Sequence, residues 1–141
     1  MDEKSLEFWR NHSLKFLEMV LSTDRRGVLE NADGYGKQVR ECGDTVETYL
    51  TVRDGRIKSA YFATDGCLYS VACANATVHL VEGKTIQEAM AVTPEVIMAY
   101  LETLPPEEEH CAELAARSLH LALADSMENE RHPWKKFYRK N

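Results

Sequence analysis

The feature that most constrains the fold of this 141-residue chain is a two-residue turn between two stretches of alternating sequence. Residues 46–53 place an apolar or β-branched side chain at every second position from Val46, which is typical of a half-buried strand. Asp54-Gly55 follows, and this pair predicts a type I′ turn because both residues tolerate positive φ angles. Residues 57–64 form the returning strand. The sequence therefore predicts a tight antiparallel β-hairpin.

The rest of the chain predicts one more strand and several helices. A short strand is expected over residues 37–41, followed by a tight turn at Cys42-Gly43-Asp44. Periodicity and capping residues predict helices over residues 6–21, 67–83, 85–90, 94–101 and 107–127. Because strands and helices are segregated, we expect an α+β fold, a three-stranded antiparallel sheet with helices packed on one face. The length suits one domain covering residues 1–141.

Composition and charge exclude several classes of protein. With 44% hydrophobic and 28% charged residues, the chain has the profile of a soluble globular protein. No apolar run approaches the roughly 20 residues of a membrane helix, and the acidic start is unlike a secretory signal, so we expect a cytoplasmic protein. The net charge is -6, although residues 131–141 carry five basic side chains and no acid. The remainder is therefore strongly acidic, which argues against binding to nucleic acid there.

Two interpretations of the basic end, residues 128–141, stay open. It is either a solvated chain end or a contact for a partner, made by its basic side chains together with Trp134, Phe137 and Tyr138.

Four cysteines carry the chemical information: Cys42, Cys67, Cys73 and Cys111. In a cytosolic chain, cysteines indicate metal binding or catalysis more often than disulfides. None forms a C-x-x-C pair, which excludes zinc-ribbon and thioredoxin patterns. A metal site must therefore be assembled from distant parts of the chain.

The hairpin predicts where two of these cysteines meet. If Arg53 faces Arg56 and the ladder has no bulge, Asp44 lies near Asp65 and Cys42 near Cys67, at one edge of the sheet. Cys67 also begins a helix, a position that favours a thiolate.

Two further candidates, His110 and Cys111, begin the last helix after a double proline, and only tertiary packing can bring them to the same place. For any single cysteine a buried packing role is as good an interpretation, and it suits Cys73 best. Asp44 alone could be a turn residue.

These motifs resemble the U-type iron–sulfur cluster assembly scaffolds, namely IscU and the N-terminal domain of NifU. The likeness covers residues 12–125, with residues 1–11 as an N-terminal extension. The matching segments are Gly34-Tyr35-Gly36-Lys37, Cys42-Gly43-Asp44-Thr45-Val46-Glu47, Asp54-Gly55-Arg56-Ile57, Gly66-Cys67, Glu82-Gly83-Lys84-Thr85, Leu104-Pro105-Pro106 and His110-Cys111.

The resemblance implies an α+β fold with a metal site at one tip of the sheet, and a carrier protein that is not an enzyme. It implies that Cys42, Cys67 and Cys111 hold a transient [2Fe–2S] cluster with Asp44 and His110 beside them, and that zinc can bind the same ligands when the cluster is absent. The implied partners are a cysteine desulfurase, apo iron–sulfur acceptor proteins and, for many members, a frataxin-like protein and an Hsp70/J-type chaperone pair.

The chain also departs from the family pattern. Leu68 follows Cys67 where a glycine is usual, Ser22-Thr23-Asp24 replaces the usual Asn-Pro-Arg, and Glu107-Glu108-Glu109 stands where the chaperone motif carries Val-Lys.

Two functions other than a cluster scaffold are consistent with these cysteines. One is a zinc-dependent sulfur acceptor of the SufU type, although the Leu-Pro-Pro and His-Cys pattern favours the scaffold. The other is a structural zinc site, which Asp44 argues against because such sites seldom use a carboxylate.

Overall fold

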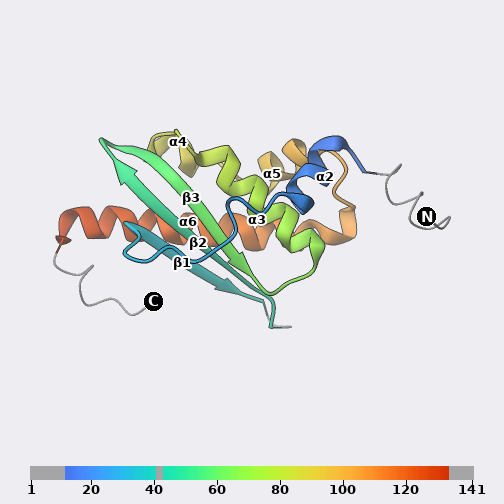
Figure 1. Ribbon diagram of the computed structural model, residues 1–141, viewed down its shortest axis with the longest axis horizontal. Helices are drawn as coiled ribbons and strands as arrows, with labels where there is room; N and C mark the ends of the chain where they lie inside the picture. Colours follow the sequence, from blue (N-terminus) through green and yellow to red (C-terminus); the bar gives the residue numbers. More distant parts are fainter. Residues whose placement is uncertain (1–11, 41–42, 134–141) are drawn as a thin grey trace.

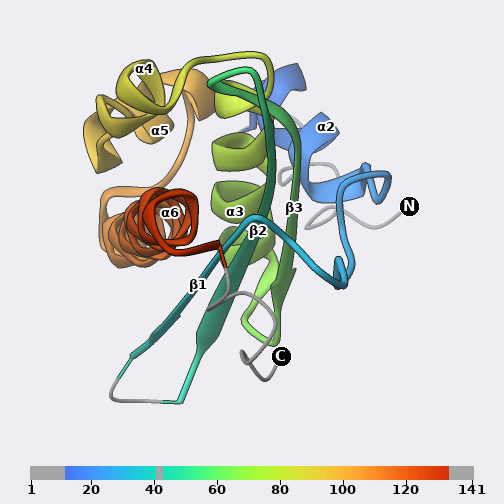
Figure 2. The same cartoon turned by 90° about the vertical axis from the view of Figure 1, so that its left-hand side faces the viewer.

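The computed structural model describes residues 12–40 and 43–133. It is an α+β fold in which a three-stranded antiparallel sheet carries helices α3 and α6 on one face (Figures 1 and 2). The fold class predicted from the sequence is confirmed. The elements are α2 (Leu14–Leu21), β1 (Gly34–Val39), β2 (Thr45–Arg53), β3 (Arg56–Thr64), α3 (Leu68–Val81), α4 (Ile86–Met90), α5 (Pro94–Leu101), the 3₁₀ helix η1 (Pro106–Glu108) and α6 (Glu109–Arg131).

The β2–β3 hairpin has the predicted turn. Asp54 and Gly55 adopt φ angles of 54° and 75°, as a type I′ turn requires. Arg53 faces Arg56, also as predicted. The strand order is β1-β2-β3, so β2 is the central strand and β1 and β3 are the edge strands.

The predicted register, however, is wrong by one residue from Thr51 to the end of the hairpin away from the turn. A bulge between Thr51 and Val52 shifts the ladder, so that Val46 pairs with Thr64 rather than with Ala63. A β-bulge inserts an extra residue into one strand and increases the local twist. The expected pairing of Asp44 with Asp65 is therefore displaced, and Asp65 instead accepts hydrogen bonds from the backbone N–H and the hydroxyl of Thr45, at 2.9 and 3.0 Å.

The first strand begins earlier than predicted because its glycines belong to the sheet. A Cβ atom at Gly34 would lie 2.3 Å from the carbonyl oxygen of Ala122, and one at Gly36 would lie 2.2 Å from that of Ser118. Only glycine permits such a close approach of two backbones. The strand expected over residues 37–41 therefore starts at Gly34, and residue 41 lies outside the described residues.

Helix α6 packs along β1 and β2 and is the longest element of the described chain. The buried hydroxyl of Ser118 fixes its position: it donates to the carbonyls of Gly36 and Val46 at 3.1 and 3.0 Å and lies 2.8 Å from the Thr48 hydroxyl. The helix was expected over residues 107–127. It begins instead at Glu109, because η1 occupies the residues after the double proline, and it extends to Arg131.

Helix α3 packs on β3 and also contacts α2, α5 and α6. Figure 2 shows it between the sheet and α5. Its side chains are buried on nearly every side, which includes Cys73 at 0% exposure, so the predicted packing role of Cys73 is confirmed. The Asn75 side-chain amide donates to the carbonyls of Met19 and Ser22 and ties the end of α2 to α3. The predicted helix over residues 6–21 is described only from Leu14, since residues 1–11 lie outside the described residues.

Candidate metal site

Cys67 lies between the end of β3 and the first turn of α3, at the N-cap position of that helix. A short turn holds it there: the Gly66 N–H donates to the Thr64 hydroxyl at 3.1 Å. Gly66 also lies close to α3, because a Cβ atom at this position would lie 2.5 Å from the Ser70 hydroxyl oxygen. The Cys67 thiol makes no capping hydrogen bond and is exposed to solvent. It is therefore accessible to a reacting partner.

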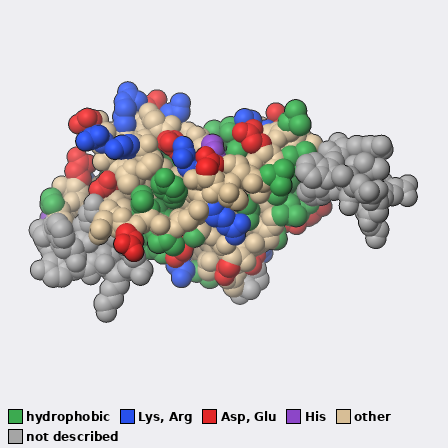
Figure 3. Space-filling model, in the orientation of Figure 1, with side chains coloured by type: hydrophobic (Ala, Val, Ile, Leu, Met, Phe, Trp, Pro, Cys, Tyr) green, Lys and Arg blue, Asp and Glu red, His purple; other side chains and the backbone are tan. Residues whose placement is uncertain are grey.

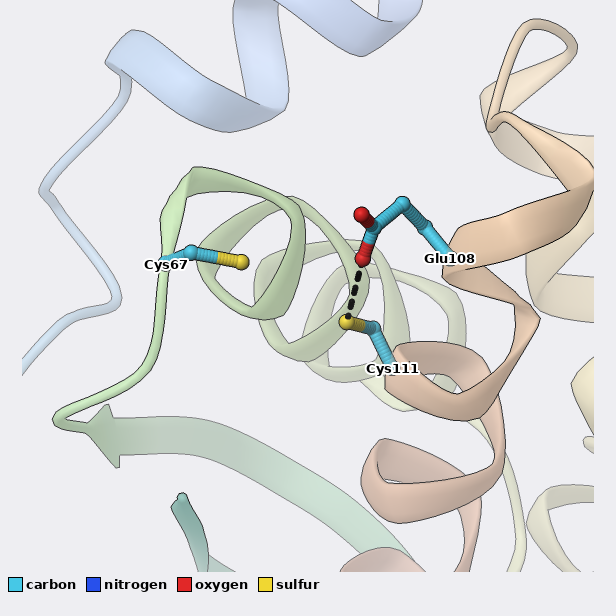
Figure 4. Close-up of side chains that lie close together, drawn as sticks. All are labelled: Cys67, Glu108 and Cys111. Carbon is cyan, nitrogen blue, oxygen red and sulfur yellow. Dashed lines mark hydrogen bonds between the residues drawn. The ribbon is translucent and has the colours of Figure 1, made fainter. Parts of the chain in front are cut away.

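Cys111 lies in the first turn of α6 and is buried, with 1% of its surface exposed. The double proline sets up this position: η1 starts at Pro106, and the Pro105 carbonyl accepts a hydrogen bond from the Glu108 N–H at 2.9 Å. The 3₁₀ turn leads directly into α6 and points both Glu108 and Cys111 toward the start of α3 (Figure 4). Residues far apart in the sequence thus meet at one end of the sheet.

Cys67, Glu108 and Cys111 form a compact group of possible ligands (Figure 4). Their two sulfur atoms and a carboxylate oxygen all lie within 4.8 Å of one another. The Cys111 thiol donates a hydrogen bond to Glu108 Oε2 at 3.6 Å. In a tetrahedral zinc site, bond lengths of about 2.0–2.3 Å separate ligand atoms by roughly 3.5–3.8 Å. The three side chains therefore fit a metal ion after a small contraction of the group.

Ser70 contacts both sulfur atoms from the first turn of α3. Its hydroxyl donates to Cys111 Sγ at 3.6 Å and lies 4.0 Å from Cys67 Sγ. Ser70 itself is 1% exposed, so water does not compete strongly for this hydroxyl. Hydrogen bonds of this kind orient metal ligands and tune the charge on sulfur.

The electrostatics of Cys111 favour the neutral thiol when no metal is bound. Burial raises the pKa of Cys111 to about 12; the Ser70 hydrogen bond opposes this shift, and the charges of Cys67 and Glu108 add to it. A metal ion replaces the proton on a thiol ligand, because the bound form is the thiolate. Binding at this group would therefore release a proton from Cys111.

The structure brings only some of the predicted ligands together. Cys67 and Cys111 meet as expected, whereas Cys42 lies outside the described residues. Within residues 12–40 and 43–133, the compact group includes neither Asp44 nor His110. Asp44 is partly buried in the β1–β2 connection, where its carbonyl accepts the Arg40 N–H at 2.8 Å. His110 Nε2 lies 3.6 Å from Glu108 Oε2, so it contacts the group through that carboxylate.

Glu108 is the member of the group that the sequence analysis missed. The run Glu107-Glu108-Glu109 was considered only as a change in a chaperone motif. One signal could have indicated it: Glu108 precedes Cys111 by three residues, the spacing that places side chains on one face of a helix.

The fold and the thiol–carboxylate group define a small α+β domain with a candidate metal site. Residues 12–132 match the family model described as the NifU-like N terminal domain. The chain therefore belongs to this family, as its resemblance to the U-type scaffolds indicated.

Named relatives agree with this assignment. The chain is 37% identical over 100 residues to the iron-sulfur cluster assembly scaffold protein IscU 1 of Archaeoglobus fulgidus, an alignment covering 70% of this chain and 65% of that protein. It is 34% identical over 114 residues to the IscU scaffold protein of Aquifex aeolicus, covering 79% of this chain and 73% of the relative. The aligned part thus spans somewhat less than two thirds of the Archaeoglobus relative.

Solved structures share the fold. A scaffold protein for the SUF system from Fervidobacterium islandicum superposes with a TM-score of 0.67 at 23% identity, covering 81% of this chain and 97% of that one. A NifU-like N-terminal protein from Brucella abortus gives a TM-score of 0.64 at 19% identity, covering 85% and 94%. No helix within the described part of the chain is long and apolar enough to cross a membrane.

Proposed function

We propose that this protein is an iron–sulfur cluster assembly scaffold that builds a transient [2Fe–2S] cluster and passes it to apo-proteins. The observation that carries the proposal is the meeting of Cys67, Cys111 and Glu108 at the end of the sheet. Thiolates suit both iron–sulfur clusters and zinc, and a carboxylate is a harder, weaker partner for such a cluster. A set of two thiolates and one carboxylate is therefore suited to a cluster that must later be released.

The two cysteines are suited to different tasks. Cys67 is exposed, so it can accept sulfur from the persulfide of a cysteine desulfurase. In this step the outer sulfur forms a bond to the Cys67 thiolate, the S–S bond of the donor breaks, and the desulfurase cysteine leaves as a thiolate. Cys111 is buried and lies across from Cys67, where it can hold iron that has entered the site.

The full ligand set in this proposal also contains Cys42, Asp44 and His110. The inclusion of His110 is supported by the distance of 3.6 Å between His110 Nε2 and Glu108 Oε2. We place Cys42 and Asp44 in the set because they lie in the sequence between β1 and β2, and β2 begins beside the end of β3 that leads to Cys67. When no cluster is present, zinc is expected at the same ligands.

A zinc-dependent sulfur acceptor is the second candidate function. It is favoured by the combination of an exposed thiol with a ligand group that fits zinc after a small contraction. In that case the chain would receive persulfide sulfur at Cys67 and pass it on without building a cluster.

Anaerobic reconstitution separates these functions. The full chain is incubated with iron, cysteine and a desulfurase, visible absorption is followed, and transfer to an apo-ferredoxin is measured. A scaffold develops the absorption of a [2Fe–2S] cluster and activates the acceptor, and Cys67→Ala abolishes both. Cys73→Ala is the matched control, because this thiol is fully buried in the core and does not belong to the group of possible ligands. Zinc binding with sulfur uptake but no cluster would favour the sulfur acceptor.

The partners in this proposal are a cytoplasmic cysteine desulfurase and apo iron–sulfur acceptors, with a frataxin-like protein as a further candidate. Chaperone binding at Leu104-Pro105-Pro106 is expected to be weak, because Glu107 and Glu108 place negative charge where a lysine-bearing motif is usually read. Glu108 also faces the thiols rather than a partner. Binding of a peptide covering this segment to an Hsp70-type protein, compared with a Glu107→Val, Glu108→Lys peptide, measures the effect.

A further inference from the structure

A hollow lies beside the candidate metal site, between the end of β1 and the first half of α6. Its volume is about 350 Å³, and the residues that line it include Arg40, His110, Glu113 and Arg117, with Leu114 among the apolar ones. Helix α6 packs on β1, and Figure 2, which views α6 almost end-on, shows β1 passing beside it. The volume is at the small end of the range for ligand pockets, which suits a ligand of a few heavy atoms.

The two arginines of this hollow have no carboxylate partner among the described residues. Neither guanidinium forms an ion pair or a side-chain hydrogen bond within residues 12–40 and 43–133. Glu113 lines the same hollow four residues before Arg117, yet it pairs with neither arginine. His110 contacts Glu108, so its partner lies on the side of the metal site.

Two arginines without an ion-pair partner in the described part of the chain and one glutamate line this hollow, which leaves a net positive charge that favours an anion between the arginines. Guanidinium groups bind carboxylate and phosphate oxygens through pairs of parallel N–H···O hydrogen bonds, which gives both strength and orientation. Arg40 is held half-buried at the end of β1, and its backbone is fixed by the Asp44 carbonyl. Arg117 comes from α6, whose position on the sheet is fixed by Ser118 next to it. The backbones of both arginines are therefore held in place, and the Arg117 side chain is exposed to solvent.

We propose that this hollow is a binding site for a small oxyanion, a molecule that presents carboxylate or phosphate groups to Arg40 and Arg117. The site shares His110 with the neighbourhood of Cys111, so a bound anion would lie next to the metal site without competing for its thiols. The proposal concerns binding alone and holds whether the protein assembles clusters or relays sulfur.

Calorimetric titration of the full purified chain tests the proposal at constant ionic strength, with inorganic phosphate in one arm and succinate in the other. We expect saturable binding of at least one anion with one site per chain, and the better ligand identifies phosphate or carboxylate as the natural group. Arg40→Gln and Arg117→Gln should each weaken binding at least fivefold.

Arg131→Gln is the matched control. It removes the same charge from the same helix, but at the far end, where the basic end of the chain begins. It should leave the affinity unchanged, which separates this site from general attraction to basic residues. If neither anion saturates, or if all three variants bind as the wild type does, the hollow is not an oxyanion site and the proposal is overturned.

Discussion

The α6 interface, where Gly34 and Gly36 contact Ser118 and Ala122, differs from the Cys67 loop, residues 65–67, in what limits movement. At the interface, two backbones touch and no side chain can turn aside. In the loop, the close neighbour of Gly66 is only the side chain of Ser70, and Cys67 faces solvent. Cys111, on α6, therefore belongs to the rigid core, whereas Cys67, in the loop, can change its position. Such a division allows a metal ion to draw Cys67 toward a fixed Cys111.

The largest effect should follow from filling the α6 interface. Gly36→Val would place a branched side chain against the α6 backbone, and we expect a loss of about 3 kcal/mol or more in the free energy of unfolding. Urea denaturation measures this loss. Lys37→Val is the control, because Lys37 is exposed on the same strand. Equal losses in both variants would mean that the contact between the backbones is not what holds α6.

Substitution of Cys67 or Cys111 should affect the free energy of unfolding differently but should abolish zinc binding in both cases. In the metal-free protein, Cys111→Ala removes a buried sulfur and should cost about 1 kcal/mol, whereas Cys67→Ala should stay within about 0.5 kcal/mol. Both variants should lose the zinc, about one ion per chain, that we expect after aerobic purification. Urea denaturation with chelator and metal analysis give the two quantities. If Cys111→Ala and Cys67→Ala lowered the free energy of unfolding equally, the core would not hold Cys111 more firmly than Cys67.

Removal of the Ser70 hydroxyl should have a smaller effect, confined to the metal. Ser70→Ala deletes the hydrogen bond to Cys111 Sγ, which is worth about 1 kcal/mol, or roughly fivefold in zinc affinity. Competition with a chromophoric chelator measures the affinity. Ser118→Ala, another buried serine, should reduce stability without changing zinc affinity, since its hydroxyl bonds to the backbone carbonyls of Gly36 and Val46. Unchanged affinity in Ser70→Ala would remove Ser70 from the site.

A substitution of Asp44 tests whether the β1–β2 connection, like the Cys67 loop, can move relative to the metal. If Asp44 opens an exchange route by moving on and off the metal, Asp44→Ala should slow cluster loss about two- to threefold while the thiolates keep it bound. Decay of cluster absorbance and transfer to an apo-acceptor give the rates, with Asp54→Ala, in the distant hairpin turn, as the control. Equal or faster loss in Asp44→Ala would assign Asp44 to the structure of the turn.

The sequence predicted features that depend on local rules and missed those that depend on packing. The Asp54-Gly55 turn and the helix at Cys67 follow from residue preferences over a few positions, and both are confirmed. The bulge at Thr51 and Val52 has no such local signal, so the register was wrong by one residue.

Two more differences have the same origin. The strand expected over residues 37–41 did not include Gly34, whereas the close approach of α6 requires a glycine at this position of the sheet. The contribution of Glu108 becomes visible only when η1 turns it toward the thiols.

Helix α6 connects the candidate metal site to the opposite end of the sheet. Its 23 residues span about 34 Å, and Ser118 anchors it to β1 and β2 near its middle. Cys111 lies about 10 Å from this anchor on one side and Asn129 about 16 Å on the other, at 1.5 Å per residue. Asn129 donates a hydrogen bond to the Asp33 carbonyl, at the entrance to β1. Because one rigid helix carries both residues, the contacts that position Asn129 also help to position a metal ligand about 27 Å away along the same axis.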